Sequence, residues 1–213
     1  MNSPGTFATK SPLASLRKLV PAKADAEGCG LCNVALTADH AHLIEPRSRK
    51  IICACRSCAI LFDSQQAAKY RRVGGAVRVL ADFCQSEAQW DDLGVPIGLA
   101  FFCYSTAHAQ TIALYPGPAG LTEAKVDSRV WNELTEQNPT LKSLAPDVEA
   151  LLINRIKQAR EHYLVPIDVC FRLTGMIRRS WRGLSGGAQV WRDIDGFFTD
   201  LRRVAARSEK SRA

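Results

Sequence analysis

Four cysteines, arranged in two C-x-x-C pairs, are the residues of this sequence with the clearest capacity for chemistry. Cys29 and Cys32 form the first pair, Cys55 and Cys58 form the second, and 22 residues separate the pairs. Two such pairs hold one tetrahedral metal ion in zinc ribbons, with metal–sulfur bonds of about 2.3 Å. Four sulfurs close the coordination shell and leave no position for water. The spacing therefore predicts one structural metal ion, zinc in the first instance.

Iron is the alternative metal, because four thiolates also hold iron in rubredoxin-like proteins. There, each C-x-x-C pair is normally followed by glycine, which lets a backbone amide approach the sulfur. Here Asn33 and Ala59 follow the pairs. Asparagine tolerates the left-handed backbone conformation, whereas alanine does so poorly. These residues favour zinc and leave a rubredoxin-like electron-transfer protein as the alternative.

Three further side chains are alternative ligands for the same ion. Cys53 lies two residues before Cys55, so in an extended chain both side chains point the same way. His40 and His42 are likewise two residues apart, so on the strand expected there both side chains lie on one face. Histidines at such positions are more typical of surface groups or of groups that support the ligands.

The elements around these cysteines predict an α+β protein. We expect a flexible leader at 1–27, a zinc-ribbon-like cysteine module at 28–63, an α+β domain at 64–206 and a polar tail at 207–213. In the module, apolar pairs at 43–44 and 51–52 flank a charged turn, as in a hairpin.

The domain that follows is expected to hold an antiparallel sheet and C-terminal helices. Apolar runs at 97–104 and 111–115 predict a second hairpin, ended by Pro116–Gly117–Pro118, whose sheet is covered on parts of both faces. Residues 127–137 predict a helix. Residues 149–156 fit a strand or a helix, and 162–167 fit a strand. Asp168 is the expected N-cap of a helix to Trp181, and a last helix is expected at 188–206.

Charge and composition restrict the class of protein. The net charge is +7, but 22 of the 28 basic residues lie in the first 81 or the last 44 residues, on either side of an acidic middle. This distribution suits internal ion pairs or a charged protein partner. A zinc-ribbon regulator that binds nucleic acid through Arg47, Arg49, Lys50 and Arg56 is a weaker alternative. The first 28 residues lack the apolar segment of a secretory signal, and no apolar run is long enough to cross a bilayer, so we expect a cytoplasmic protein.

A search for catalytic residues gives no enzyme. His108 and His162 stand outside any nucleophile motif, and the acidic residues are not paired by spacing. The GLSGG turn is a possible anion or partner contact, made of Arg178, Arg179, Arg182, Gly186 and Gly187. It lacks the lysine and hydroxyl residue of a P-loop, and a helix–helix turn is the simpler interpretation.

Several stretches taken together resemble a known family. They are CGLC, ICACRSCAILF, VPIGLAFF, LYPGPAG, PDVEALLINR, YLVPID and WRGLSGG-x3-W, in this order over residues 28–202. They are similar to an uncharacterised bacterial family often encoded beside uptake NiFe-hydrogenase genes. The resemblance implies an accessory protein for hydrogenase assembly, maturation or electron transfer, with a hydrogenase subunit or maturation factor as its partner. It carries over only the four paired cysteines as ligands.

Overall fold

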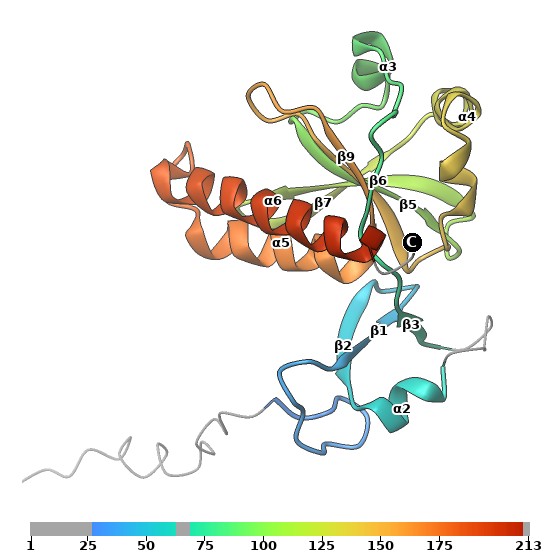
Figure 1. The fold of residues 1–213 in the computed structure, drawn as a ribbon, viewed down its shortest axis with the longest axis vertical. Coiled ribbons are helices and arrows are strands. Elements are labelled where there is room, and N and C mark those ends of the chain that lie inside the picture. Colours follow the sequence, from blue (N-terminus) through green and yellow to red (C-terminus); the bar gives the residue numbers. More distant parts are fainter. Residues whose placement is uncertain (1–26, 63–68, 211–213) are drawn as a thin grey trace, which may run out of the picture.

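The computed structural model describes residues 27–62 and 69–210, and Figure 1 shows that they form two sheets joined by one crossing of the chain. The smaller sheet has three strands in the order β2-β1-β3, and the larger has six in the order β4-β9-β8-β5-β6-β7. Every strand pair in both sheets is antiparallel. The predicted α+β class, with a cysteine module before an antiparallel sheet and C-terminal helices, is confirmed.

The cysteine module contains the predicted hairpin and a third strand from beyond it. Its elements are β1 (Ala41–Glu45), β2 (Lys50–Ala54), α2 (Arg56–Ile60) and β3 (Arg71–Val73). β3 pairs with β1, so the module sheet ends at Val73, beyond the expected boundary at 63–64. That boundary, and residues 1–26 of the expected leader, lie outside the described residues.

The second part of the chain, from β4 onward, is called the sheet domain below. Its strands are β4 (Arg78–Val79), β5 (Leu99–Ser105), β6 (Gln110–Gly117), β7 (Gly120–Lys125), β8 (Glu149–Asn154) and β9 (Glu161–Pro166). Its helices are α3 (Glu87–Asp92), α4 (Ser128–Gln137), the 3-10 helix η1 (Pro139–Ser143), α5 (Ile167–Ser180) and α6 (Gly187–Lys210).

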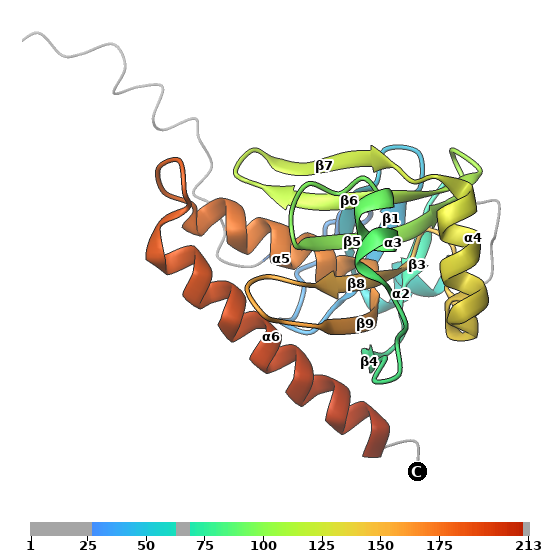
Figure 2. The same cartoon turned by 90° about the horizontal axis from the view of Figure 1, so that it is seen from above.

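Helices cover both faces of the large sheet. On β5, Phe101 faces the layer of α5 and α6, whereas Phe102 packs with Trp90 of α3 and Leu134 of α4. Figure 2 shows α6 running obliquely past β8 and β9 beside α5. Because side chains alternate along a strand, a nearly continuous apolar run can fill two cores at once. The predicted coverage of both faces is therefore confirmed.

Two local expectations are wrong. Pro116 does not end the second hairpin: β6 continues through Gly117, and β7 follows after a two-residue turn. Asp168 is not the N-cap of α5, since Pro166 occupies that position and Asp168 lies in the first turn. Its carboxylate instead binds His42 of β1.

The module is joined to the sheet domain by packing and by ion pairs. Ile44 and Val73 of the module lie in the same apolar cluster as α5 and α6. Arg71 of β3 donates to the carboxylate of Asp147 over 3.0 Å, and that aspartate is buried. Arg49 also pairs with Glu123 of β7. Basic residues of the module thus bind acidic residues of the middle segment, as internal pairing predicts.

Candidate metal centre

The two C-x-x-C pairs converge at one point. The Sγ atoms of Cys29, Cys32, Cys55 and Cys58 all lie within 4.8 Å of one another, and those of Cys32 and Cys55 are 3.7 Å apart. Sulfur atoms around a tetrahedral ion with bonds of about 2.3 Å must lie slightly under 4 Å from each other. These four cysteines, the cysteine site, can therefore hold a metal ion.

The first pair lies on a tight turn fixed by backbone hydrogen bonds. The amides of Cys29 and Asn33 donate to the carbonyls of Val34 and Cys29, each over 2.8 Å. Asn33 has a φ of 60°, the left-handed conformation that asparagine accepts. A Cβ on Gly30 would lie 2.3 Å from the Ile52 side chain, so only glycine allows this turn to reach β2. The turn thereby carries Cys29 and Cys32 to the second pair.

The second pair begins a short helix. Cys55 is the N-cap of α2, and its Sγ accepts a hydrogen bond from the amide of Cys58 over 3.4 Å. Ala59 lies inside this helix and is fully buried. The two turns therefore differ: the first ends in a left-handed residue and the second continues into a helix.

The environments of these thiols shift the pKa values of Cys29 and Cys58 in opposite directions. Burial raises the pKa of Cys29, but hydrogen bonds from the backbone of Cys32, Cys55 and Leu31 outweigh it and lower that pKa to about 6. Hydrogen bonds with the thiols of Cys55 and Cys32 raise the pKa of Cys58 to about 12. The hydrogen bonds among these groups thus favour ionisation of Cys29 and oppose ionisation of Cys58. A divalent cation replaces such protons when it binds.

The remaining cysteines are placed differently. Cys103 and Cys170 are buried among apolar side chains of the sheet domain, and burial raises the pKa of Cys103 to about 12. Cys84 is exposed. Cys53 does not join the other four: with His40 and His42 it forms a separate group of close ligand atoms.

The GLSGG turn connects α5 to α6. The guanidinium of Arg182 donates to the carbonyls of Arg179 and Trp181, both over 2.8 Å, and therefore caps the end of α5. Gly186 and Gly187 have φ values of 84° and 72°, which a side chain rarely adopts. Arg178 and Arg179 are exposed in the last turn of α5. The possible anion or partner contact thus includes one arginine bound to the end of α5 and two that are exposed.

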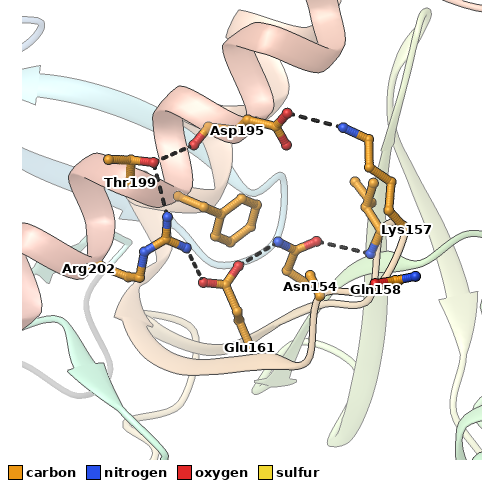
Figure 3. Close-up of a pocket in the computed structure, with 10 residues that line it drawn as sticks. Asn154, Lys157, Gln158, Glu161, Asp195, Thr199 and Arg202 are labelled. Atoms are coloured by element: carbon orange, nitrogen blue, oxygen red, sulfur yellow. Dashed lines mark hydrogen bonds and ion pairs between the residues drawn. The ribbon is translucent and has the colours of Figure 1, made fainter.

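Two hollows flank α6. One, of about 690 Å³, lies between the β8–β9 hairpin and α6, and Figure 3 shows its charged groups bound to one another. Glu161 accepts from Asn154 over 2.7 Å and from Arg202, and Lys157 pairs with Asp195 over 3.1 Å. The other, of about 570 Å³, is mainly apolar and lies between Trp181, Trp191 and the β6–β7 turn. Neither hollow contains a histidine or a cysteine.

The two histidines of the sheet domain make different contacts. His162 stacks on Phe83, with ring centroids 4.4 Å apart, and burial together with Arg155 and Arg160 lowers its pKa to about 4. Nδ1 of His108 lies 3.0 Å from the hydroxyl of Ser105.

Residues 28–205 match the model of a family described as "Family of unknown function (DUF5947)". The chain belongs to this family. A search of curated proteins and a search of solved structures each returned no match. The match in DUF5947 spans both the cysteine module and the sheet domain, and it agrees with the sequence-based expectation of an uncharacterised family.

No helix in the described ranges combines the length and the apolar character needed to span a membrane.

Sequence reasoning found the cysteine site but missed the position of Asp168. Its carboxylate lies 126 residues away in sequence from His42, and its Oδ2 is 2.8 Å from the Nδ1 of that ring. No local pattern reports such a contact. The separate group had a partial signal, because the H-x-H spacing places both histidines on one face of a strand. The spacing does not give the register that sets Cys53 opposite His42.

Proposed function

We propose that this protein is a cytoplasmic accessory factor of a NiFe-hydrogenase system, with a structural zinc ion that shapes a surface for a protein partner. The convergence of the four paired thiols carries the proposal. Such a site is closed by its ligands, so it organises the chain and does not bind substrate. The hydrogenase system is proposed from the resemblance of the ordered sequence stretches alone.

The choice of zinc is supported by the difference between the two turns. In a rubredoxin-like site both turns are normally followed by glycine, whereas here Asn33 is left-handed and Ala59 is a buried helical residue. Zinc has no geometric preference beyond the tetrahedron and no redox chemistry, which suits a site with unlike halves.

A partner surface is supported by apolar side chains that surround the cysteines. Leu31 and Val34 on the first turn, and Ile60 and Leu61 at the end of α2, are exposed. Both turns are anchored at the same four sulfurs, so a bound ion fixes these side chains relative to one another. Rigid, exposed apolar groups are typical of protein-binding sites.

The proposal is tested by capture from the native host with a tagged full-length chain. We expect a NiFe-hydrogenase subunit or maturation factor, identified by mass spectrometry, to copurify with the wild type. Leu61→Asp should lose it. Leu184→Asp, which changes an exposed leucine in the GLSGG turn, should retain it. Absence of every hydrogenase-related protein from the wild-type sample, or equal capture by the Leu61→Asp chain, would contradict the proposal.

A further inference from the structure

A second set of metal-type ligands lies on the other face of the β1–β2 hairpin. Ligand atoms of His40, His42 and Cys53 all lie within 4.8 Å of one another. His42 and Cys53 are directly opposite in the strand register, and His40 is two residues before His42. The pleat therefore brings the three side chains to one face. Leu43 and Ala54, their neighbours in sequence, pack on the opposite face with the cysteine site.

This face of the hairpin meets the sheet domain. Ile44, two residues after His42, packs into the apolar cluster of α5 and α6. Asp168, in the first turn of α5, accepts from His42 Nδ1 over 2.8 Å. The three ligands thus lie at the junction of the module and the sheet domain, whereas the four paired cysteines lie within the module.

Both imidazole rings are held in the orientation that a metal ligand requires. Nδ1 of His40 lies 2.8 Å from the carbonyl oxygen of Thr37, and Nδ1 of His42 faces the carboxylate of Asp168. Carbonyl and carboxylate oxygens accept, so each Nδ1 carries the proton and donates it. The Nε2 lone pairs then point away from these bonds. A carboxylate or carbonyl behind a ligating histidine is the usual arrangement at metal sites.

One of these nitrogens is buried without a partner. Nε2 of His40 makes no hydrogen bond to any residue that the structure describes, and the side chain is only 11% exposed. A buried acceptor left unpaired costs free energy, so native structures seldom keep one. The Glu27 carboxylate lies 3.9 Å from this nitrogen, which is beyond hydrogen-bonding distance. A cation bound by this nitrogen would account for the arrangement.

We infer that His40, His42 and Cys53 form a second metal site, which binds a divalent transition-metal ion of the zinc class and has an exchangeable fourth position. Two imidazoles and one thiolate suit such an ion and exclude calcium and magnesium, which take oxygen ligands. Three protein ligands leave one position open, unlike the four thiolates of the cysteine site. The Glu27 carboxylate lies 3.9 Å from Nε2 of His40, and Asp168 positions His42.

The experiment is a titration of the full-length chain, first stripped of metal by a chelator under reducing conditions, with Zn²⁺ and a chromophoric competitor. The wild type should bind two ions. The double variant His40→Ala/His42→Ala and the single variant Cys53→Ala should each bind one. The matched controls His108→Ala and Cys84→Ala should bind two. One ion in the wild type, or two ions in the histidine and Cys53 variants, would overturn the second site.

Asp168→Asn tests the site without removing a ligand. The Asp168 carboxylate fixes the ring of His42, so its loss should weaken the second ion about 10–100-fold and leave the first unchanged. Asp195→Asn, which changes an exposed residue of α6, should alter neither affinity. An unchanged second affinity in Asp168→Asn would contradict the positioning role. All these outcomes are independent of which protein partner is captured.

Discussion

In the sheet domain, large apolar side chains fill both faces of β5, β6, β8 and β9, whereas in the cysteine module only Cys29, Leu43, Ala54 and Ala59 are buried in the described part of its own core. One of those four is itself a proposed ligand. Burial stabilises at roughly 25 cal/mol per Å² of apolar surface, so the module gains little from it. The comparison teaches that the two regions of one chain need different sources of stability: apolar packing stabilises the second, and we expect metal coordination at the cysteine site to stabilise the first.

The largest expected effect is the loss of the ion from the cysteine site. Cys29→Ser or Cys58→Ser should lose that ion and unfold the module, because structural zinc contributes about 10–16 kcal/mol of apparent folding free energy in zinc-finger peptides. Hydrogen exchange should show lost protection in β1 and β2, while β5 and β8 remain protected. Elemental analysis gives the metal content.

Cys84→Ser is the matched control for these variants, because Cys84 is exposed and belongs to neither ligand group. It should keep the metal content and the exchange pattern of the wild type. Equal metal content in Cys29→Ser, Cys58→Ser and Cys84→Ser would contradict the stabilisation of the module by metal at the cysteine site.

The converse variant weakens the sheet domain. Phe101 is fully buried in the layer beneath α5 and α6, so Phe101→Ala should lower the free energy of unfolding by about 3–5 kcal/mol in urea titrations. The ion should remain bound at low urea. Tyr104→Ala, at an exposed position of the same strand, should change stability by less than about 0.5 kcal/mol. A loss of metal in Phe101→Ala without denaturant would show that the two regions are not separable.

The connection between the regions can be broken at Arg71. Arg71→Ala removes the guanidinium that binds the buried carboxylate of Asp147 and the carbonyl of Pro146. We expect the free energy of unfolding from urea titrations to fall by about 1–3 kcal/mol, because the Asp147 carboxylate loses its charged partner and keeps its bonds to Thr106. Metal content should not change. Arg47→Ala, in the exposed β1–β2 turn, is the control; an equal loss there would contradict a specific role for Arg71.

The smallest expected effect is a pH-dependent change in stability at Asp127, outside the cysteine module. Hydrogen bonds from the side chain and the backbone amide of Arg129 lower the pKa of Asp127, the N-cap of α4. A carboxyl whose pKa is lower in the folded state stabilises the protein above its unfolded pKa, and this contribution disappears as pH falls through the folded pKa. Asp127→Asn should therefore be slightly less stable than the wild type at neutral pH, and equal to it in acid. A stability difference that does not change with pH would contradict this origin.

The features that could be predicted from the sequence are those with local signals. The C-x-x-C pairs, the hairpin around residues 45–50 and the helix at 128–137 were predicted because their signals are local: cysteine spacing, apolar pairs on either side of a charged turn, and apolar residues on one face of a helix. β7 was missed because its side chains are only half buried, which removes the alternation, and because Pro116 resembles a strand end. A proline is tolerated there because it lies close to the turn between β6 and β7.

Long-range contacts set the limit of sequence reasoning. Asp168 precedes an apolar helical pattern, which is typical of an N-cap, but the rigid φ of Pro166 already starts the helix and frees the carboxylate for His42. His40, His42 and Cys53 were considered as ligands of the same ion as the paired cysteines, because alternation alone does not tell which face of the hairpin they share. The register of β1 against β2 separates the two groups.

Zinc-edge X-ray absorption of the His40→Ala/His42→Ala chain, loaded with one equivalent of Zn²⁺, is the most direct test of the cysteine site. With the second group removed, the coordination shell should consist of four sulfur atoms at about 2.3 Å. A shell dominated by nitrogen or oxygen, or a chain that retains no zinc, would contradict the convergence of the four thiolates on one ion.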